Sequence, residues 1–292
     1  MAEYPTVAAL WIGGSLTWLE QLCLKSYVDA GQHVVLYTYE GVQGVPEGVE
    51  VRDANLILEG AKMYRHGRTG SVALFSDLFR FHLMQKAPGE IWIDTDIYCW
   101  KPLDVGQPHV FGYETRRQLN GAVLGLPPDS EALGLLLEFT KEEYPIPDFV
   151  APKMKADYIE RAEAGDPVHV SEMPWGVWGP LGVTWYLNQT GEAKYAQPVE
   201  VFYPIHYRDR NLFFKRPMRV VNALSDSTLT LHMWARIKKF SGANYGGYAP
   251  PGSFLEHKLR EHGIDQTQGR IVSHGKISFD HTEFDAAAAN TG

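Results

Sequence analysis

The spacing of apolar residues in the first part of the chain alternates between strand-like and helix-like patterns. Residues 6–12 form an apolar run that ends in two glycines, which predicts a buried strand and a tight turn. Apolar positions over 18–27 recur at helical spacing, and Gly31 would cap that helix. Residues 33–39 and 49–52 predict two more strands. This order of elements favours a parallel sheet covered by helices.

A second helix is predicted over residues 71–86, with Ser71 as its N-cap. Apolar residues cover most of its circumference, which is typical of a helix packed inside a protein. Pro88 and Gly89 would end this helix and lead into a buried strand over 90–96, which ends in two carboxylates.

Periodic segments are fewer in the rest of the chain. Residues 110–113, 122–126 and 228–234 have strand-like patterns, and 130–144 has a helical one. Residues 145–180 are rich in proline, glycine and tryptophan, and we expect an irregular segment there. We therefore predict an α/β fold with a mixed, mainly parallel central sheet flanked by helices.

Length and composition are those of an ordinary globular protein: 292 residues, of which 45% are hydrophobic and 21% charged. We expect one domain over 1–285, in which 145–200 form a lid or an acceptor-binding region. The alanine-rich end, 286–292, should be a disordered tail. The polar, glycine-bearing segment 64–70 is a further candidate for a mobile loop.

Charge and cysteine usage argue against several partners. The chain has 27 basic and 35 acidic residues and no block of Lys and Arg, so nucleic acid is not an expected partner. No apolar run approaches the ~20 residues that span a bilayer, so membrane contact would be at most peripheral. The N-terminal residues lack the basic segment of a signal peptide, and Cys23 and Cys99 are the only cysteines. These features favour a reduced, cytoplasmic setting without a zinc site.

Two carboxylates stand at the end of the predicted strand over 90–96. Asp94 and Asp96 are two residues apart, so a straight strand would direct both side chains to one face. Oxygen ligands of this kind hold hard divalent cations. An Asp-x-Asp tripeptide alone is a weak signal, because acidic pairs are common at turns and caps. Its apolar surroundings strengthen the signal, since burying two carboxylates without a cation is costly.

An acid and a base lie on the preceding predicted helix. Asp77 and Arg80 are three residues apart and therefore share one helix face. An exposed ion pair of little energetic value is the simplest reading. Because this helix is apolar over most of its circumference, we expect the pair to be buried instead. An arginine there can bind a phosphate through two parallel hydrogen bonds.

The residues of the predicted helix and of the following strand, taken together in chain order, resemble the signature of a known family. The motif runs through Ser76-Asp77-x-x-Arg80, Trp92-Ile93-Asp94-Thr95-Asp96 and Lys101-Pro102-Leu103. It resembles the DXD-containing glycosyltransferases of family 32, which include Och1-like mannosyltransferases, α1,4-galactosyltransferases and capsular-polysaccharide transferases. It also resembles the glucosylating domain of large clostridial toxins. Three shorter segments match the same family: Leu10-Trp11-Ile12-Gly13-Gly14, Asn120-Gly121 and Trp178-Gly179-Pro180. The resemblance is strongest over residues 7–125.

This resemblance implies a GT-A-type, Rossmann-like fold and a metal-dependent, retaining glycosyltransferase. Such an enzyme moves a hexose from a nucleotide-sugar donor, here a UDP-sugar by preference, to a saccharide or glycoconjugate acceptor. Synthesis of a surface polysaccharide is the process that it suggests.

The family pattern also implies roles for particular residues. Asp94, Asp96 and His232 would hold Mn²⁺ or Mg²⁺, although a lone histidine is more often structural. Asp94, Asp96 and Arg80 would carry the catalysis. The donor would be bound by Trp11, Ile12, Gly13, Tyr39, Asp77, Arg80, Thr95, Asn120 and Lys238. This chain has Ala235 where some relatives have glycine between the histidine and the lysine.

Other polar and aromatic residues have two interpretations each. Glu114 and Asn120 would bind hydroxyl groups of the donor sugar, or serve only a turn and a strand edge. Trp175 and Trp178 would form an acceptor platform, or pack beneath a loop. Residues 207–210 would face the acceptor, or form a solvated loop.

Three other functions compete with this one. A sugar-1-phosphate nucleotidyltransferase would need a basic, glycine-rich loop after the first strand, and residues 13–17 contain no basic residue. A glycoside hydrolase needs two carboxylates roughly 5–9.5 Å apart, but it leaves Asp77 and Arg80 unexplained. A non-catalytic protein that binds sugar nucleotides has no need for all of these residues together.

Overall fold

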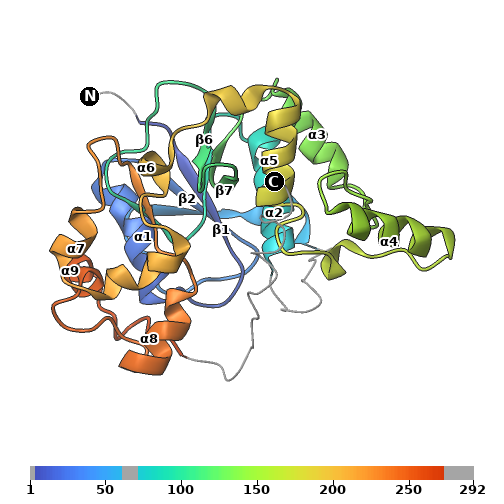
Figure 1. The fold of residues 1–292 in the computed structure, drawn as a ribbon. Helices are drawn as coiled ribbons and strands as arrows, with labels where there is room; N and C mark the ends of the chain where they lie inside the picture. The colour runs from blue at the N-terminus through green and yellow to red at the C-terminus, as the bar shows by residue number, and fades with distance from the viewer. Residues whose placement is uncertain (1–3, 61–71, 273–292) are drawn as a thin grey trace.

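The computed structural model describes residues 4–60 and 72–272 (Figure 1). The strands of its central sheet are β1 Val7–Trp11, β2 Val34–Thr38, β3 Val49–Asp53, β4 Ile91–Ile93, β6 Val110–Tyr113 and β7 Leu119–Gly125. Their order is β3-β2-β1-β4-β7-β6. β1 pairs in parallel with β2 and β4, and β2 pairs in parallel with β3. β7 is antiparallel to β4 and β6, so the predicted mixed, mainly parallel sheet is confirmed.

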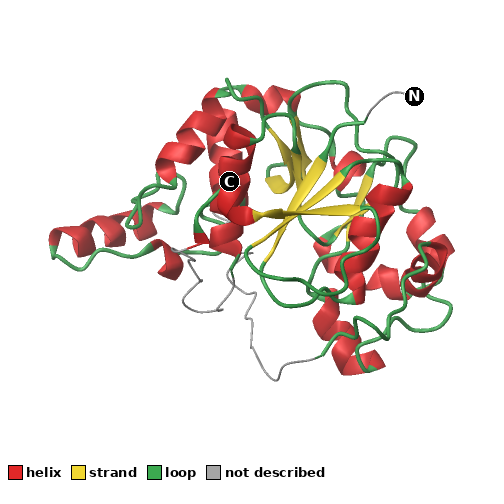
Figure 2. Cartoon of the chain, turned by 180° about the vertical axis from the view of Figure 1, so that it is seen from behind, coloured by secondary structure: helices red, strands yellow, loops and turns green. Residues whose placement is uncertain are grey.

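Helices cover both faces of this sheet (Figure 2). The α-helices are α1 Trp18–Asp29, α2 Ala73–Lys86, α3 Glu131–Phe139, α4 Pro152–Glu163, α5 Pro180–Gln189, α6 Val199–Phe202, α7 Pro217–Val221, α8 Ile237–Tyr245 and α9 Phe254–Glu261. A separate two-stranded sheet joins β5 Ile97–Cys99 to β8 Thr230–His232. Within the described residues, none of the helices combines the length and the apolar character needed to cross a lipid bilayer.

The side chains of β1 show why the first strand is an unbroken apolar run. Val7 and Ala9 pack on the side of α1, whereas Ala8 and Leu10 pack on the side of α2, α3 and α5. Because successive residues of a strand point to opposite faces, a strand buried on both faces needs apolar residues throughout.

The predicted strands and the first two helices are confirmed, with ends that shift by a few residues. Gly31 lies one residue beyond Ala30, the actual C-cap of α1, and has a φ of 84°. The N-cap of α2 is Val72. Ser71, the predicted N-cap, lies outside the described residues, as do the segments 64–70 and 286–292.

Two predictions for the second half are wrong. The helix expected over 130–144 does begin after Ser130, whose side chain accepts a hydrogen bond from a backbone N–H of the first turn, but it ends at Phe139. Residues 145–180 are not irregular throughout, because they contain α4, a twelve-residue helix that projects from the body of the molecule (Figures 1 and 2). Tyr158 is the one buried residue that α4 contributes.

Candidate metal and donor site

The two motif carboxylates lie in a turn rather than on one straight strand. β4 ends at Ile93, and β5 begins at Ile97, whose N–H donates to the carbonyl of Asp94 at 3.0 Å. The turn takes the chain out of the central sheet and pairs β5 with β8. The straight-strand geometry expected for Asp94 and Asp96 is therefore wrong, because pairing with β8 redirects the chain.

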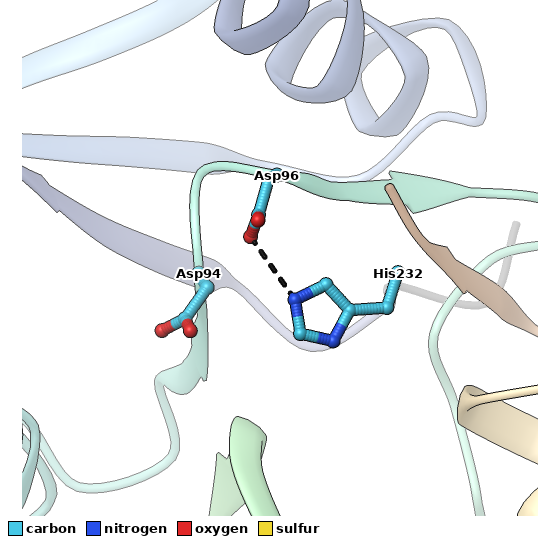
Figure 3. A group of neighbouring side chains, drawn as sticks. All are labelled: Asp94, Asp96 and His232. Carbon is cyan, nitrogen blue, oxygen red and sulfur yellow. Dashed lines mark ion pairs between the residues drawn. The ribbon is translucent and has the colours of Figure 1, made fainter. Parts of the chain in front are cut away.

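The turn nevertheless brings the predicted ligands together. Asp94, Asp96 and His232 each present one ligand atom, and these atoms all lie within 4.8 Å of one another (Figure 3). His232 reaches the site because it is paired with Ile97 in the register of β8 on β5. Two carboxylate oxygens and an imidazole nitrogen form a donor set that can hold a divalent metal ion. The residues thus fit a divalent cation.

Asp96 is the more buried of the two carboxylates. Its Oδ1 lies 3.4 Å from Nε2 of His232, and its Oδ2 accepts a hydrogen bond from the N–H of Ala235. Burial alone would raise the pKa of Asp96, but the charge and hydrogen bond of His232, the N–H of Ala235 and the charge of Lys238 together outweigh burial and lower it. Burial alone would lower the pKa of His232, and the Asp96 carboxylate raises it instead. Without a cation, the two side chains therefore form an ion pair.

The His232 ring is held by stacking. It lies on the indole ring of Trp234 with centroids 3.7 Å apart and an interplanar angle of 18°. Trp234 has a φ of 59°, the one positive φ of a non-glycine residue in the part of the chain that the structure describes. Its indole N–H donates to the carbonyl of Ile205 at 3.2 Å. An unfavourable backbone conformation is thus retained where it fixes the orientation of a candidate ligand.

Asp94 is the more exposed carboxylate, with 32% of its side chain accessible. Its Oδ1 accepts hydrogen bonds from the indole N–H of Trp92 at 2.8 Å and from Nη2 of Arg80 at 3.2 Å. Two donors on one oxygen fix the orientation of this carboxylate.

Arg80 lies beneath the site and is almost fully buried. Its Nη1 donates to the carbonyl of Gly121 at 2.7 Å, and its Nη2 lies 3.1 Å from Oδ1 of Asp77. A Cβ at Gly121 would be 2.7 Å from Nη1, so this approach requires glycine. The guanidinium group also lies over the ring of Trp92, 4.9 Å from its centroid. Arg80 therefore positions Asp94, and contact with a donor phosphate stays a prediction.

Asp77 is buried beside Arg80. Burial raises the pKa of Asp77 to about 7, although the Arg80 charge acts in the opposite direction. The backbone of Gly179 lies close to this carboxylate, since a Cβ there would be 2.7 Å from Oδ2 of Asp77. Close packing of α2 against this segment therefore requires the glycine of Trp178-Gly179-Pro180.

Several predicted donor-binding residues lie at the same edge of the sheet. Trp11 and Tyr39 stand at the carboxyl ends of β1 and β2, and Asp94 follows the carboxyl end of β4. The carboxyl ends of neighbouring parallel strands meet at one edge, which is where open α/β sheets bind ligands. Ile12 and Gly13 continue from β1, both partly exposed. The hydroxyl of Tyr39 donates to the carbonyl of Leu58 at 2.7 Å, so it is already engaged.

Lys238 lies at this edge but has a partner within the protein. Its ammonium group forms an ion pair with the buried carboxylate of Glu20 and lies 5.4 Å from the centroid of the Trp11 ring. Glu20 also accepts hydrogen bonds from the backbone and the hydroxyl of Thr17, the N-cap of α1. In this structure Lys238 neutralises a buried acid, and its predicted contact with a diphosphate is untested.

Asn120 and Glu114 are joined by a hydrogen bond across the β6–β7 hairpin. Nδ2 of Asn120 donates to Oε2 of Glu114 at 2.7 Å, and Oδ1 of Asn120 accepts from the N–H of Ala122 at 2.8 Å. The carbonyl of Ala122 in turn accepts from the N–H of Asp94. Asn120 is therefore two residues from the backbone contact that fixes Asp94. Thr95 is partly exposed in the turn between the two carboxylates.

The two tryptophans proposed as an acceptor platform differ. Trp178 is fully buried in a core cluster beside α2, so it packs. Trp175 is exposed and keeps both interpretations.

Sequence reasoning missed the supporting residues of the site. Trp92 was predicted only as part of a buried strand and of the motif, and the stacking of Trp234 on His232 was not predicted. Tyr203 was not considered, yet its hydroxyl accepts the N–H of Val123 at 3.0 Å and holds β7 in place. The spacing of two between Trp92 and Asp94 was the one available signal, because it places both on the same side of β4.

Comparison with known proteins adds little. No family model matches this chain. No curated protein matches it either. Among solved structures, the chain is similar to the PaToxG glycosyltransferase, with a TM-score of 0.40, 14% sequence identity and coverage of 65% of this chain and 72% of that chain. A TM-score this low assigns neither a fold family nor an activity, so the resemblance to family 32 stays a prediction.

Proposed function

We propose that this protein is a metal-dependent glycosyltransferase that moves a hexose from a nucleotide-sugar to a saccharide or glycoconjugate acceptor. The observation that carries the proposal is the cluster of Asp94, Asp96 and His232 at the carboxyl edge of the sheet, with ligand atoms within 4.8 Å. The cluster lies beside β1, so the nucleotide would bind at the carboxyl end of β1, at the edge where open α/β sheets bind ligands. The motif resemblance over residues 7–125 supports the same function.

A bound Mn²⁺ or Mg²⁺ would neutralise negative charge that develops on the departing diphosphate. The chain's own residues prepare that chemistry. Trp92 and Arg80 orient the Asp94 carboxylate, and His232 and Ala235 orient Asp96. Groups that are oriented before the reaction lose no free energy by reorganising during it.

The donor is proposed to lie along the sheet edge. Trp11, Ile12, Gly13 and Tyr39 would line the nucleotide pocket, with UDP as the favoured nucleotide. Thr95, Asn120 and Asp77 would contact the sugar, and Lys238 would contact the diphosphate. Lys238 would need to leave Glu20 for that role.

The proposed stereochemistry is retention of the anomeric configuration. The departing phosphate oxygen takes the proton of the acceptor hydroxyl on the same face of the sugar, so no dedicated base is required. Glu114 is the second candidate for a role at the reacting carbon. It lies near enough for its charge to raise the pKa of His232.

Larger features of the proposal concern the whole chain. One domain over 1–285 would carry the site, and 64–70 and 145–180 would order over the bound donor and exclude water. The acceptor would belong to a surface polysaccharide, and the protein would act in the cytoplasm.

A thermal-shift screen of nucleotide-sugars tests the donor site, each with Mn²⁺ and each with a chelator. A ligand that binds only the folded state raises its stability by mass action. We expect a metal-dependent rise in Tm with one nucleotide class, absent in Asp94→Asn, followed by release of that nucleotide in a turnover assay. Binding of a nucleotide-sugar without turnover on any acceptor would favour the non-catalytic alternative. Turnover of a nucleoside triphosphate with a sugar phosphate would favour the nucleotidyltransferase.

A further inference from the structure

Positive charge is concentrated in one segment of an otherwise acidic chain. Residues 206–241 hold eight Lys or Arg and two Asp or Glu, whereas the whole chain has 27 basic and 35 acidic residues and a net charge of -8. This segment contains the 3-10 helix η5, Tyr207–Phe214, followed by α7. Such segregation creates a local field opposite in sign to the net charge, and it favours an anionic partner.

The outward surface of α7 and its N-terminal flank combines cations with apolar side chains. We call it the α7 patch, and it consists of Lys215, Arg216, Met218, Arg219 and Val221, all of which are exposed. Met218 is 63% accessible and Val221 is 39% accessible. Val220 is buried and holds the short helix on the body of the protein. The helix contacts η5 and α9, at the side of the molecule away from α4 (Figure 1).

The cations of the patch have no side-chain partners among the described residues. Over residues 4–60 and 72–272, the side chains of Lys215, Arg216 and Arg219 make no ion pair, hydrogen bond or ring contact. Two basic residues elsewhere in the described chain are paired instead. Lys238 pairs with Glu20, and Lys258 pairs with Glu261. The three α7 cations are therefore open to an external anion.

An anionic lipid surface fits this combination better than a soluble polyanion does. Phosphate headgroups attract Lys and Arg within a Debye length of the surface, about 8 Å at physiological salt. Exposed apolar side chains next to those cations can enter the boundary between headgroups and acyl chains. A nucleic acid or an acidic polysaccharide would use the cations but would gain nothing from Met218 and Val221.

We propose that the α7 patch docks the protein on an anionic membrane surface, with Lys215, Arg216 and Arg219 at the phosphates and Met218 and Val221 in the interface. This interaction does not depend on the proposed glycosyl transfer. It would hold the protein against the bilayer through its own side chains, without a membrane-spanning segment.

Co-sedimentation with vesicles tests the proposal on the full chain. We expect binding to vesicles of equal parts phosphatidylglycerol and phosphatidylcholine, and none to phosphatidylcholine alone. The variant Lys215→Gln/Arg216→Gln/Arg219→Gln should bind on the order of a hundredfold more weakly, because each cation contributes about fivefold near an anionic surface. Binding by the unchanged protein should also fall as salt rises.

A second triple variant matches the loss of charge elsewhere. Lys141 follows α3, Lys153 and Lys155 lie on α4, and Lys141→Gln/Lys153→Gln/Lys155→Gln changes the net charge equally. It should bind vesicles within about threefold of the unchanged protein, because these cations lie outside the patch. Met218→Gln, a single exposed change, should weaken vesicle binding several-fold with the salt dependence kept.

Three results would overturn the proposal. The first is the absence of binding to the mixed vesicles. The second is an equal loss of binding in both triple variants, which would indicate net charge alone. The third is retention on heparin that the α7 variant loses, without any vesicle binding, because that pattern identifies a soluble polyanion. Thermal unfolding of each variant shows whether it is folded, and Met218→Gln tests the surface if the triple variant is not.

Discussion

The two carboxylates of the Asp-x-Asp turn differ in where their support comes from. Asp94 is 32% accessible and is held by Trp92 and Arg80, which lie within 14 residues of it along the chain. Asp96 is 11% accessible and is held by His232 and by the N–H of Ala235, which is 139 residues away. One carboxylate is thus fixed by the central sheet and its helix, and the other by the C-terminal half. A site assembled in this way exists only when both halves have packed.

Removal of either carboxylate should have the largest effect. Asp94→Asn and Asp96→Asn should each reduce turnover at least about a thousandfold, because a lost cation leaves the charge on the departing diphosphate unbalanced. The two variants should differ in stability. Asp96→Asn should lower the Tm more, since it disturbs buried hydrogen bonds. Equal Tm values of the two variants, together with unequal turnover, would contradict this difference between Asp94 and Asp96.

Replacement of Arg80, which contacts both Asp77 and Asp94, should destabilise the fold. Arg80→Met leaves Asp77 and Asp94 without their buried cation, and the free energy of unfolding should fall by about 3–5 kcal/mol. Lys86→Met, an exposed change on the same helix, should alter it by less than about 0.5 kcal/mol. Urea unfolding of both variants measures the difference. Similar values for the two would show that Arg80 is not structural.

Removal of the distant ligand should weaken metal binding without unfolding the protein. His232→Gln should reduce the affinity for Mn²⁺ by roughly 10–100-fold, the range seen when a group that tunes a metal site is lost. Isothermal titration calorimetry gives the affinity, and circular dichroism checks the fold. Unchanged affinity would remove His232 from the ligand set.

Metal affinity should rise with pH. Asp96 raises the pKa of His232, so below that pKa a cation must displace a proton from the imidazole. The affinity for Mn²⁺ should therefore fall about tenfold for each unit of pH below it. His232→Gln should lose most of this dependence. A flat profile between about pH 6 and about pH 8 in the unchanged protein would contradict the ion pair.

Stability of the metal-free protein should change in the opposite direction. The folded state holds the protons of His232 and Asp77 more tightly than the unfolded chain does, because both pKa values are raised. Where the folded state binds more protons, stability falls as pH rises. For Asp77 this window runs from its usual value up to about 7, and for His232 it lies higher. Thermal melts in chelator should show the decline.

The smallest effect should come from the indole of Trp92. Trp92→Phe removes one hydrogen bond to Asp94, worth about 1 kcal/mol, so Mn²⁺ should bind about fivefold more weakly. Trp178→Phe, at a buried tryptophan in another core cluster, should lower the Tm and leave metal affinity unchanged. Equal effects of the two on affinity would indicate general softening of the fold.

The first half of the fold was predictable because its helices and strands bury apolar residues that recur at regular spacing. β1, β2 and α2 are all recognisable from the spacing of apolar residues, and Asp94 and Asp96 stand out against them. The missed elements lack that pattern. α4 buries one residue, Tyr158, so its sequence shows no apolar stripe. α3 stops early, where Thr140 donates its hydroxyl to the carbonyl of Leu136.

The geometry of the site was predictable only in part, because some of it depends on contacts between distant segments of the chain. That Asp94 and Asp96 belong together follows from adjacent positions in the chain. That the chain turns between them follows from the pairing of Ile97 with His232, a contact between distant segments that no local pattern encodes. The stacking of His232 on Trp234 also requires a positive φ that is rare for tryptophan.

The most direct test of the account is a calorimetric titration of Mn²⁺ into the metal-free protein and into its Asp94→Asn and Asp96→Asn variants. The account predicts a single site in the unchanged protein and weak or no binding in both variants. Undiminished binding in either variant, or no binding in the unchanged protein, would contradict a metal centre at this turn.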